Sequence, residues 1–202
     1  MMVLPDHDLV FLAYNKAGSS SIEAALAPQR SKRWEGYARL AHPLLRSDLP
    51  WKHMTALEFE RLFAWRPAIV GAHRVAVVRN PWDRMVSVWS YQRQTIPDRH
   101  PLAVELDFAD YVKAGGSGAS FMTFSDFAGD GDGGLAVDTV LRVEELADDF
   151  ADVCEARGLG RVELPRRNTT KRPAYREMYD EETAAIVADA FAADIERFGY
   201  EF

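Results

Sequence analysis

The sequence has a single cysteine, Cys154, among its 202 residues. One cysteine excludes an internal disulfide framework, and it also excludes a cysteine cluster that would bind zinc or an iron–sulfur centre. No apolar run approaches the roughly 20 residues that a membrane-spanning helix needs. The first residues, MMVLPDHDLVF, lack the basic region and the long apolar region of a signal peptide. We therefore expect a protein of the reducing cytoplasm with no membrane span.

Positive charge is also scarce, because 24 lysines and arginines face 31 aspartates and glutamates, which gives a net charge of −7. This balance argues against a general nucleic-acid binder, whose affinity comes from neutralising phosphates. Acidic residues dominate between positions 126 and 155, whereas the segment RRNTTKR at 166–172 is basic. An acidic chain with local basic segments suits a small anionic ligand better than a polyanion.

Three apolar runs predict buried strands, at positions 9–14, 75–79 and, more weakly, 139–143. Helical patterns lie between them, and this alternation is typical of an α/β fold with a mainly parallel sheet. The length suits one domain with a sizeable core. We therefore expect a single P-loop-like α/β domain over residues 1–202, with a mainly parallel central sheet flanked by helices.

Capping residues mark where several of these helices begin. A further amphipathic helix is expected over residues 144–157, where Gly158 terminates it. Cys154 falls on the apolar side of that helix, so we expect it to be a buried packing residue rather than a nucleophile. The predicted caps are Ser20 with Glu23, Thr55 with Glu58, Asn80 ahead of Pro81, and Asp180.

The segment NKAGSSS, at positions 15–21, follows the first predicted strand and precedes a helix. The first amides of a helix have no intrahelical partners, and the helix dipole is positive at that end, so an anion is stabilised there. Gly18 allows the backbone to approach a ligand, the serines add hydroxyl donors, and Lys16 adds a full positive charge. The segment is not a Walker A loop, because the lysine precedes the glycine. A plain turn with a serine cap is the alternative interpretation.

The segment VAVVRNPWDRMVSVW repeats the arrangement of strand, turn and helix. On a helical wheel one face is apolar, whereas Arg84, Ser87 and Tyr91 fall on the opposite face. Arg79 leaves the carboxyl end of the predicted strand, where ligands of open α/β sheets gather. Arg79 and Ser87 could therefore bind a second phosphate. The alternatives are that Arg79 pairs with Asp83, that Ser87 is merely solvated, and that an acid pairs with Arg84.

Two anion sites at successive strand ends suit one ligand with two anionic groups. The segments NKAGSSS (15–21) and VVRNPWDRMVSVW (77–89) together resemble the motifs of sulfotransferases. Downstream, the similarity extends to LRVEEL (141–146), LPRRNTTKR (164–172) and the closing residues 179–202, which resemble the carbohydrate-type branch and its soluble bacterial relatives. The sequence departs from the family pattern mildly, with Asn15 in place of proline and Ser20 in place of threonine.

This resemblance implies 3′-phosphoadenosine 5′-phosphosulfate as the sulfuryl donor. We expect no metal, because fixed cations stabilise the developing charge and no spacing of histidine, aspartate and glutamate suggests a metal site. It places the 5′-phosphosulfate on the first segment and the 3′-phosphate on Arg79 and Ser87. It also suggests that the basic residues Lys171 and Arg172 close over the nucleotide, although a solvated loop is the alternative. The first segment contributes Lys16, Ala17, Gly18, Ser19, Ser20 and Ser21.

Sulfuryl transfer to a hydroxyl group needs a general base within hydrogen-bonding distance. Sulfotransferases carry a histidine or glutamate for this purpose between their two phosphate motifs. His53, just before a capped helix, is our choice, because the pKa of histidine suits the task. His42 is the second choice, and we expect His73, at the start of the central strand, to be structural. A helix-entry histidine with no catalytic role is the alternative for His53.

These features predict a sulfotransferase that acts on a hydroxyl group of a carbohydrate or a small molecule, with Lys16 and His53 as catalytic residues. A P-loop kinase is one alternative, although the sequence shows neither a Walker A loop nor a magnesium-binding acid at a strand end. A non-catalytic nucleotide-binding scaffold with the same fold is the other alternative. The sequence identifies neither the acceptor nor the oligomeric state.

Overall fold

The computed structural model describes residues 1–165 and 174–202, and it divides into two compact units that are described in turn. The first unit comprises Met1–Val78 and Phe124–Thr169. The second unit comprises Arg79–Thr123 and Thr170–Phe202. The expectation of a single domain over residues 1–202 stays a prediction.

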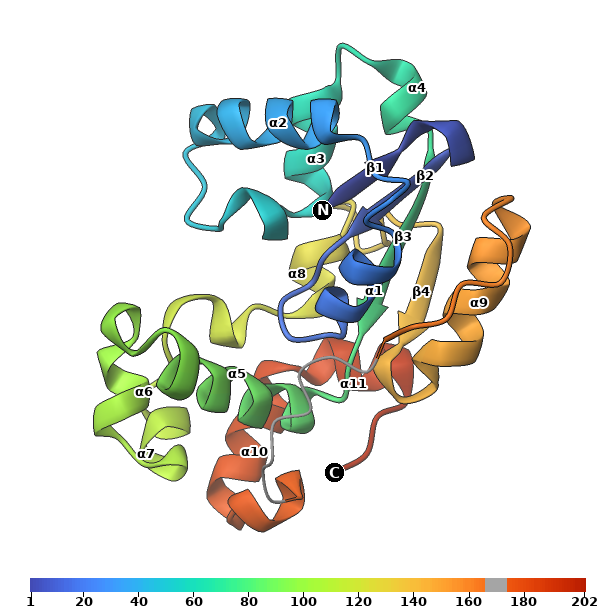
Figure 1. Cartoon of the computed structure of the whole chain (residues 1–202). Coiled ribbons are helices and arrows are strands. Elements are labelled where there is room, and N and C mark those ends of the chain that lie inside the picture. Colours follow the sequence, from blue (N-terminus) through green and yellow to red (C-terminus); the bar gives the residue numbers. More distant parts are fainter. Residues whose placement is uncertain (166–173) are drawn as a thin grey trace. The chain divides into compact units, whose positions relative to one another are not determined.

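The first unit is built on a four-stranded sheet in the order β1-β2-β3-β4. The β2–β3 and β3–β4 pairs are parallel, and only β1 runs antiparallel to its neighbour, β2. Figure 1 shows the strands side by side, and helix α9 contacts β4. The predicted α/β class with a mainly parallel sheet flanked by helices is therefore confirmed. The strands are β1 (Met2–Leu4), β2 (Leu9–Leu12), β3 (His73–Val78) and β4 (Thr139–Arg142).

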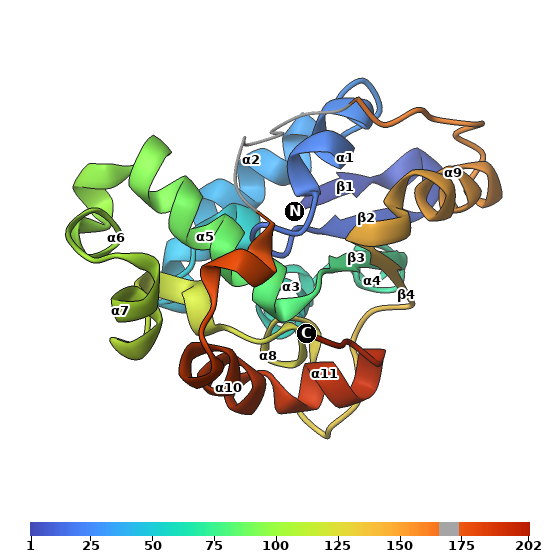
Figure 2. The same cartoon turned by 90° about the horizontal axis from the view of Figure 1, so that it is seen from below.

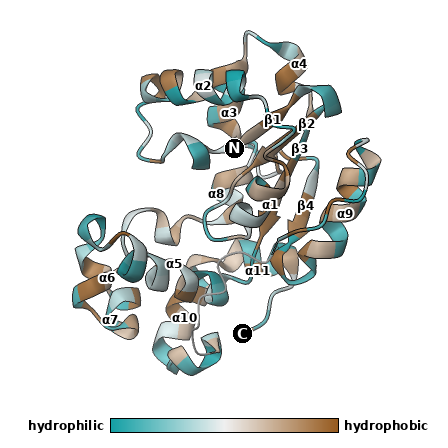
Figure 3. Ribbon diagram, viewed as in Figure 1, coloured by the Kyte–Doolittle hydropathy of each residue, from teal (hydrophilic) through white to brown (hydrophobic). Residues whose placement is uncertain are grey.

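Strand β2 is buried along its whole length, as its continuous apolar sequence predicts. Its register with β3 pairs Leu9 with His73 and Leu12 with Ala76. Because the two strands are parallel, their carboxyl ends lie at the same edge of the sheet. The strands appear as apolar segments in Figure 3. The three apolar runs thus locate the central strands to within two residues at each end.

Strand β1 is a correction to the sequence analysis, which treated the first residues only as a possible signal segment. It is joined to β2 by a short 3₁₀ helix, η1 (Pro5–His7). Asp8 then adopts a left-handed conformation with φ 47°, which closes the turn and starts β2. Proline and aspartate favour such turns. The sequence therefore contained the signal for the turn. It gave no signal for the strand before the turn, because that strand has only three residues.

The helices of the first unit surround this sheet. The capping box of Thr55 and Glu58 is confirmed, with both reciprocal hydrogen bonds in place at 3.2 Å and 2.7 Å. The box of Ser20 and Glu23 is wrong, because Gly18 is the N-cap and Ser20 lies inside the helix. These helices are α1 (Ser19–Ala25), α2 (Lys32–Ala41), α3 (Ala56–Phe63), α4 (Pro67–Val70), α8 (Phe124–Ala128) and α9 (Leu146–Ala156).

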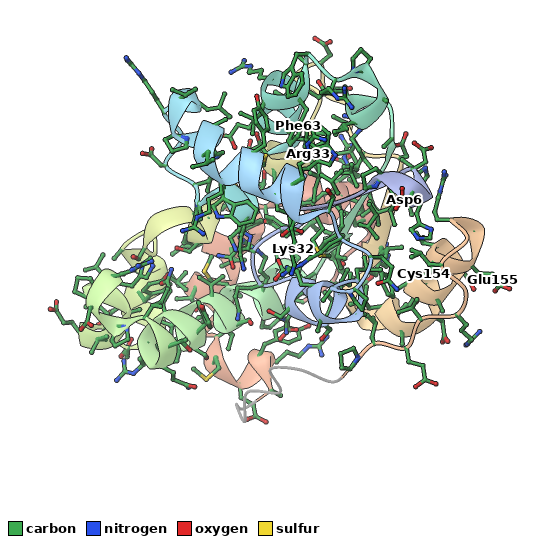
Figure 4. The ribbon with its side chains drawn as sticks, turned by 45° about the horizontal axis from the view of Figure 1, so that its top comes forward. Asp6, Lys32, Arg33, Phe63, Cys154 and Glu155 are labelled. Atoms are coloured by element: carbon green, nitrogen blue, oxygen red, sulfur yellow. The ribbon has the colours of Figure 1, made fainter. Side chains whose placement is uncertain are left out.

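Helix α9 has the amphipathic character that the sequence predicts. Cys154 is fully buried on it, and burial raises the pKa of the thiol to about 11. Its neighbour Glu155 is exposed and points away from the ribbon in Figure 4. Gly158 follows the helix with φ 70°, a left-handed conformation typical of helix ends. Cys154 is thus a packing residue, as expected.

The second unit is helical and is organised around the 15-residue helix α5. Asn80 caps this helix by accepting hydrogen bonds from the amides of Trp82 and Asp83, as predicted. Asp180 caps a helix as predicted, but the continuous last helix that we expected from Asp180 through Phe198 is instead two helices that meet at Phe191 (Figure 2). The helices are α5 (Pro81–Thr95), α6 (Pro101–Glu105), α7 (Phe108–Lys113), α10 (Glu181–Ala190) and α11 (Ala192–Phe198).

The polar face that we described on α5 is largely buried over its first turns. Arg84 is only 1% exposed, and its guanidinium donates to the carbonyl oxygens of Ser120 at 2.9 Å and Ala119 at 3.4 Å. Ser87 is buried as well, whereas Tyr91 is exposed. Neighbouring segments of the second unit therefore cover both faces of the helix. A helical wheel describes one helix alone, so it cannot show that other segments cover both of its faces.

Within the two described ranges, no helix combines the length and the apolar character needed to cross a bilayer. Nor do three or more histidine, cysteine, aspartate or glutamate side chains gather there in a way that could hold a metal ion.

Candidate functional site

The loop after β2 has two residues in the left-handed conformation. Lys16 has φ 64° and Gly18 has φ 71°. A left-handed conformation costs a residue with a Cβ atom about 1–2 kcal/mol, so the fold holds Lys16 in an unfavourable state. The loop is closed by a hydrogen bond from the amide of Ala17 to the carbonyl of Tyr14 at 3.4 Å. Alternating conformations of this kind turn backbone amides toward one concave face that can bind an anion.

Gly18 is required by packing as well as by its φ angle. A Cβ atom at this position would lie 2.7 Å from Cδ2 of Leu146 on helix α9, which is too close. The glycine therefore lets the loop approach α9. The sequence analysis assigned Gly18 to ligand approach alone, and this second reason could not be inferred from a local segment.

The three serines of the loop are not equivalent. Ser19 is buried, Ser21 is half-buried and Ser20 is exposed. Lys16 is half-buried, and Ala17 is buried. Helix α1 has only seven residues, so its dipole is weaker than the sequence pattern suggested. The charge of Lys16 and the loop amides are consequently the main features that could stabilise an anion here.

His53 lies in the same unit, at the end of the 3₁₀ helix η3 (Trp51–His53). Its Nδ1 is 2.7 Å from the carbonyl oxygen of Ala13, three residues before Lys16. A carbonyl oxygen only accepts hydrogen bonds, so Nδ1 carries the proton and Nε2 of the neutral ring has a free lone pair. This tautomer is the one that a general base requires.

The surroundings of His53 keep its ring neutral. Burial lowers the pKa of His53, whereas the hydrogen bond to Ala13 acts in the opposite direction. The N-terminal ammonium group and Lys52 also lower the pKa, and Glu23 raises it. The net lowering means that the ring is neutral at pH 7, as proton acceptance from a hydroxyl group requires.

A cavity of about 180 Å³ lies beside Lys52. Two ion pairs face it, Lys52 with Glu23 at 3.8 Å and Arg30 with Glu35 at 3.6 Å. Both separations exceed ordinary hydrogen-bond lengths, so these groups retain hydrogen-bonding capacity. The cavity has no signal in the sequence, because its residues come from separate segments. The lining residues are Met1, Met2, Glu23, Arg30, Glu35, Trp51 and Lys52.

The other two histidines that we considered have different environments. His42, the second choice for the base, is 5% exposed, and its Nε2 lies 3.9 Å from Oε2 of Glu58. Its burial makes it a poor partner for a substrate. Nε2 of His73 lies 2.9 Å from Oγ1 of Thr139, so His73 links β3 to β4. These contacts agree with a structural role for His73.

In the second unit, Arg79 is the first residue after strand β3, and it pairs with Asp83. Both Nε and Nη2 of the guanidinium donate to Oδ2 of Asp83, at 2.8 Å and 2.6 Å. The pairing that we considered as an alternative is therefore present, and a phosphate at Arg79 would compete with this carboxylate. Ser87 is 8% exposed, so it is not simply solvated. Lys171 and Arg172 lie outside the described residues.

No protein-family model matches this sequence, and no curated protein matches it. The fold is similar to that of a solved structure described as a sulfotransferase from Alicyclobacillus acidocaldarius. The two chains are 16% identical, the match covers 96% of each, and the TM-score is 0.49.

Proposed function

We propose that this protein is a sulfotransferase, which moves a sulfuryl group from 3′-phosphoadenosine 5′-phosphosulfate to a hydroxyl group of a carbohydrate or a small molecule. The observation that carries the proposal is the hydrogen bond between His53 and Ala13. It anchors a neutral, correctly protonated base on the segment that leads into the Lys16 loop. The motif order of the sequence, which resembles that of sulfotransferases, identifies the group that is transferred.

In this proposal the Lys16 loop binds the 5′-phosphosulfate. The bond between sulfur and the bridging phosphate oxygen breaks as the bond from sulfur to the acceptor oxygen forms. Negative charge then develops on the phosphate oxygen, and the ammonium group of Lys16 stabilises it. Loop amides near Gly18 hold the 5′-phosphate so that its bridging oxygen, the sulfur and the acceptor oxygen lie in line. Adenosine 3′,5′-bisphosphate is the leaving product.

His53 removes the proton of the acceptor hydroxyl group in the same step. Nε2 of the neutral ring accepts this proton, and the hydrogen bond from Nδ1 to the carbonyl of Ala13 then stabilises the charged ring. The lowered pKa of His53 helps the ring to return its proton to water after transfer. The cavity beside Lys52 is our candidate for the acceptor site, because it contains hydrogen-bonding groups of both kinds.

Arg79 and Ser87 bind the 3′-phosphate in this proposal. A guanidinium group is suited to phosphate because it donates two parallel hydrogen bonds. The phosphate takes the place of the Asp83 carboxylate, which accepts two hydrogen bonds from this guanidinium in the absence of the donor. Lys171 and Arg172 are proposed, on sequence grounds alone, to add positive charge over the nucleotide.

The proposal is tested by a transfer screen with ³⁵S-labelled donor and a panel of hydroxylated glycans, phenols and lipids. We expect label on at least one acceptor with the wild-type protein, and a loss of orders of magnitude in turnover for Lys16→Ala and for His53→Ala. Binding of the bisphosphate without transfer to any acceptor would indicate a non-catalytic scaffold. Transfer of phosphate from ATP would indicate a kinase.

A further inference from the structure

The three most exposed large hydrophobic side chains all lie in one part of the first unit. Leu40 is 81% exposed, Leu44 is 82% exposed and Trp65 is 54% exposed. Among the residues that the structure describes, every other exposed large hydrophobic residue has an exposed fraction of 38–42%. Apolar side chains in such positions indicate an interaction surface when they cluster.

The three side chains are each related to Tyr37 of helix α2, Leu40 and Leu44 by their spacing along the chain and Trp65 by direct contact. Leu40 follows Tyr37 by three residues and Leu44 by seven, so one side of α2 and of the 3₁₀ helix η2 (His42–Leu45) carries them. Nε1 of Trp65 donates to the Tyr37 hydroxyl group at 2.8 Å, and their rings are 5.4 Å apart. Trp65 is therefore held in place although it is exposed. We call the surface of Tyr37, Leu40, Leu44 and Trp65 the Leu40 face.

The segment that carries the Leu40 face has an excess of positive charge. Residues 30–66 contain eight lysines and arginines against four aspartates and glutamates, an excess of four positive charges in a chain of net charge −7. Two of the four acids, Glu35 and Glu60, are already paired with arginines. Within residues 1–165 and 174–202, the following side chains form no ion pair: Lys32, Arg33, Arg39, Arg46, Arg61 and Arg66.

Two of these arginines stack on the aromatic residues that border the face. The guanidinium of Arg66 lies 5.1 Å from the ring centre of Trp34 and 5.6 Å from that of Trp65. The guanidinium of Arg33 lies 4.9 Å from the ring centre of Trp34. Figure 4 labels Lys32 and Arg33 on α2. Stacking orders these side chains in advance, so less conformational entropy is lost when their charges bind a partner.

We propose that the Leu40 face binds the surface of an anionic lipid bilayer. Helices that lie in the interface of a membrane combine exposed leucine and tryptophan with unpaired arginine and lysine. The Leu40 face has this composition. The leucines would enter the acyl boundary, and the arginines would bind lipid phosphates. A second copy of the chain suits the face less well, because two surfaces with the same positive excess repel each other.

Co-sedimentation of the full chain with lipid vesicles tests this proposal. We expect binding to vesicles of phosphatidylcholine mixed with phosphatidylglycerol, weaker binding to phosphatidylcholine alone, and weakening at high salt. The double variant Leu40→Asp/Leu44→Asp should bind at least about ten-fold more weakly. Arg39→Gln and Arg46→Gln should each weaken binding about five-fold. Leu102→Asp, at an exposed leucine of the second unit, is the matched control and should bind like the wild type.

Two outcomes would overturn the proposal. The first is a lack of specific binding: either the wild-type protein binds no vesicle, or the wild type and the variants bind both kinds of vesicle equally. The other is a wild-type dimer in analytical ultracentrifugation that Leu40→Asp/Leu44→Asp dissociates, without any vesicle binding. Circular dichroism shows whether the double aspartate variant is folded. If it is not, vesicle binding by Arg39→Gln and Arg46→Gln tests the proposal instead. Neither outcome depends on sulfuryl transfer.

Discussion

His53 is hydrogen-bonded to Ala13, with 2.7 Å between Nδ1 and the carbonyl oxygen. The two residues are 40 positions apart in the sequence, yet this bond connects the proposed base to the segment that leads into the Lys16 loop. It also fixes which ring nitrogen carries the proton. The tautomer and the position of His53 thus have one structural origin, whereas its lowered pKa comes from burial.

The pH dependence of turnover should follow from the state of His53. Burial lowers its pKa below the usual 6.5, and only the neutral ring can accept a proton. We expect kcat to be constant near neutral pH and to fall on acidification through a pKa below 6.5, further into acid than an ordinary histidine would allow. His53→Ala should lower kcat by about 10²–10⁴-fold and abolish this acid limb. An unchanged limb in His53→Ala would assign the base to another residue.

Substitutions of Lys16 should separate stability from activity. Lys16 has φ 64°, so alanine at this position keeps the left-handed strain, whereas glycine relieves it. We expect the free energy of unfolding of Lys16→Gly to exceed that of Lys16→Ala by about 1 kcal/mol in urea denaturation. Both variants should nevertheless lose turnover, because both lack the ammonium group. Full turnover in Lys16→Gly would show that the lysine is only a turn residue.

The capping box should contribute measurably to the stability of helix α3. Thr55→Ala removes the hydroxyl group that accepts from the amide of Glu58, so we expect a loss of about 1 kcal/mol in the free energy of unfolding. Thr55→Ser keeps the hydroxyl group and should lose much less. Thermal denaturation of the three proteins measures the effect. Equal losses in the alanine and serine variants would mean that the methyl group, rather than the cap, is responsible.

The pair of Arg79 and Asp83 predicts opposite effects on binding of adenosine 3′,5′-bisphosphate. Arg79→Ala removes a charged donor, so we expect binding about ten-fold weaker or more. Asp83→Asn removes a negative charge that competes with the phosphate, so we expect tighter binding. Calorimetry gives both dissociation constants. Weakening of the same size in both variants would contradict this account, since it would make the intact ion pair itself the requirement.

Local signals in the sequence predicted the central strands and three of the four helix caps that we named, those at Thr55, Asn80 and Asp180. The run LVFLAY is buried because both faces of a central parallel strand are covered, and Thr55 and Asn80 cap helices through bonds to nearby amides. Strand β1 was missed because three residues carry no periodic pattern, and its pairing with β2 depends on a turn. The features that the sequence predicted well therefore depend on residues that are close together in the chain.

The site was predictable in its residue types but not in its contacts. Lys16 and His53 were chosen from charge, pKa and position, whereas the bond of His53 to Ala13 joins distant segments and has no sequence signal. The same holds for the close approach of Gly18 to Leu146. The burial of Arg84 has no local signal either, because the segments that cover it are distant in the sequence.

The central claim is that the Lys16 loop binds an adenosine donor that has two phosphate positions. A calorimetric titration tests this claim most directly. We expect adenosine 3′,5′-bisphosphate to bind the wild-type protein in a metal-free buffer, with higher affinity than ATP, and to bind Lys16→Ala more weakly. No heat of binding with the bisphosphate, or tighter magnesium-dependent binding of ATP, would contradict the account.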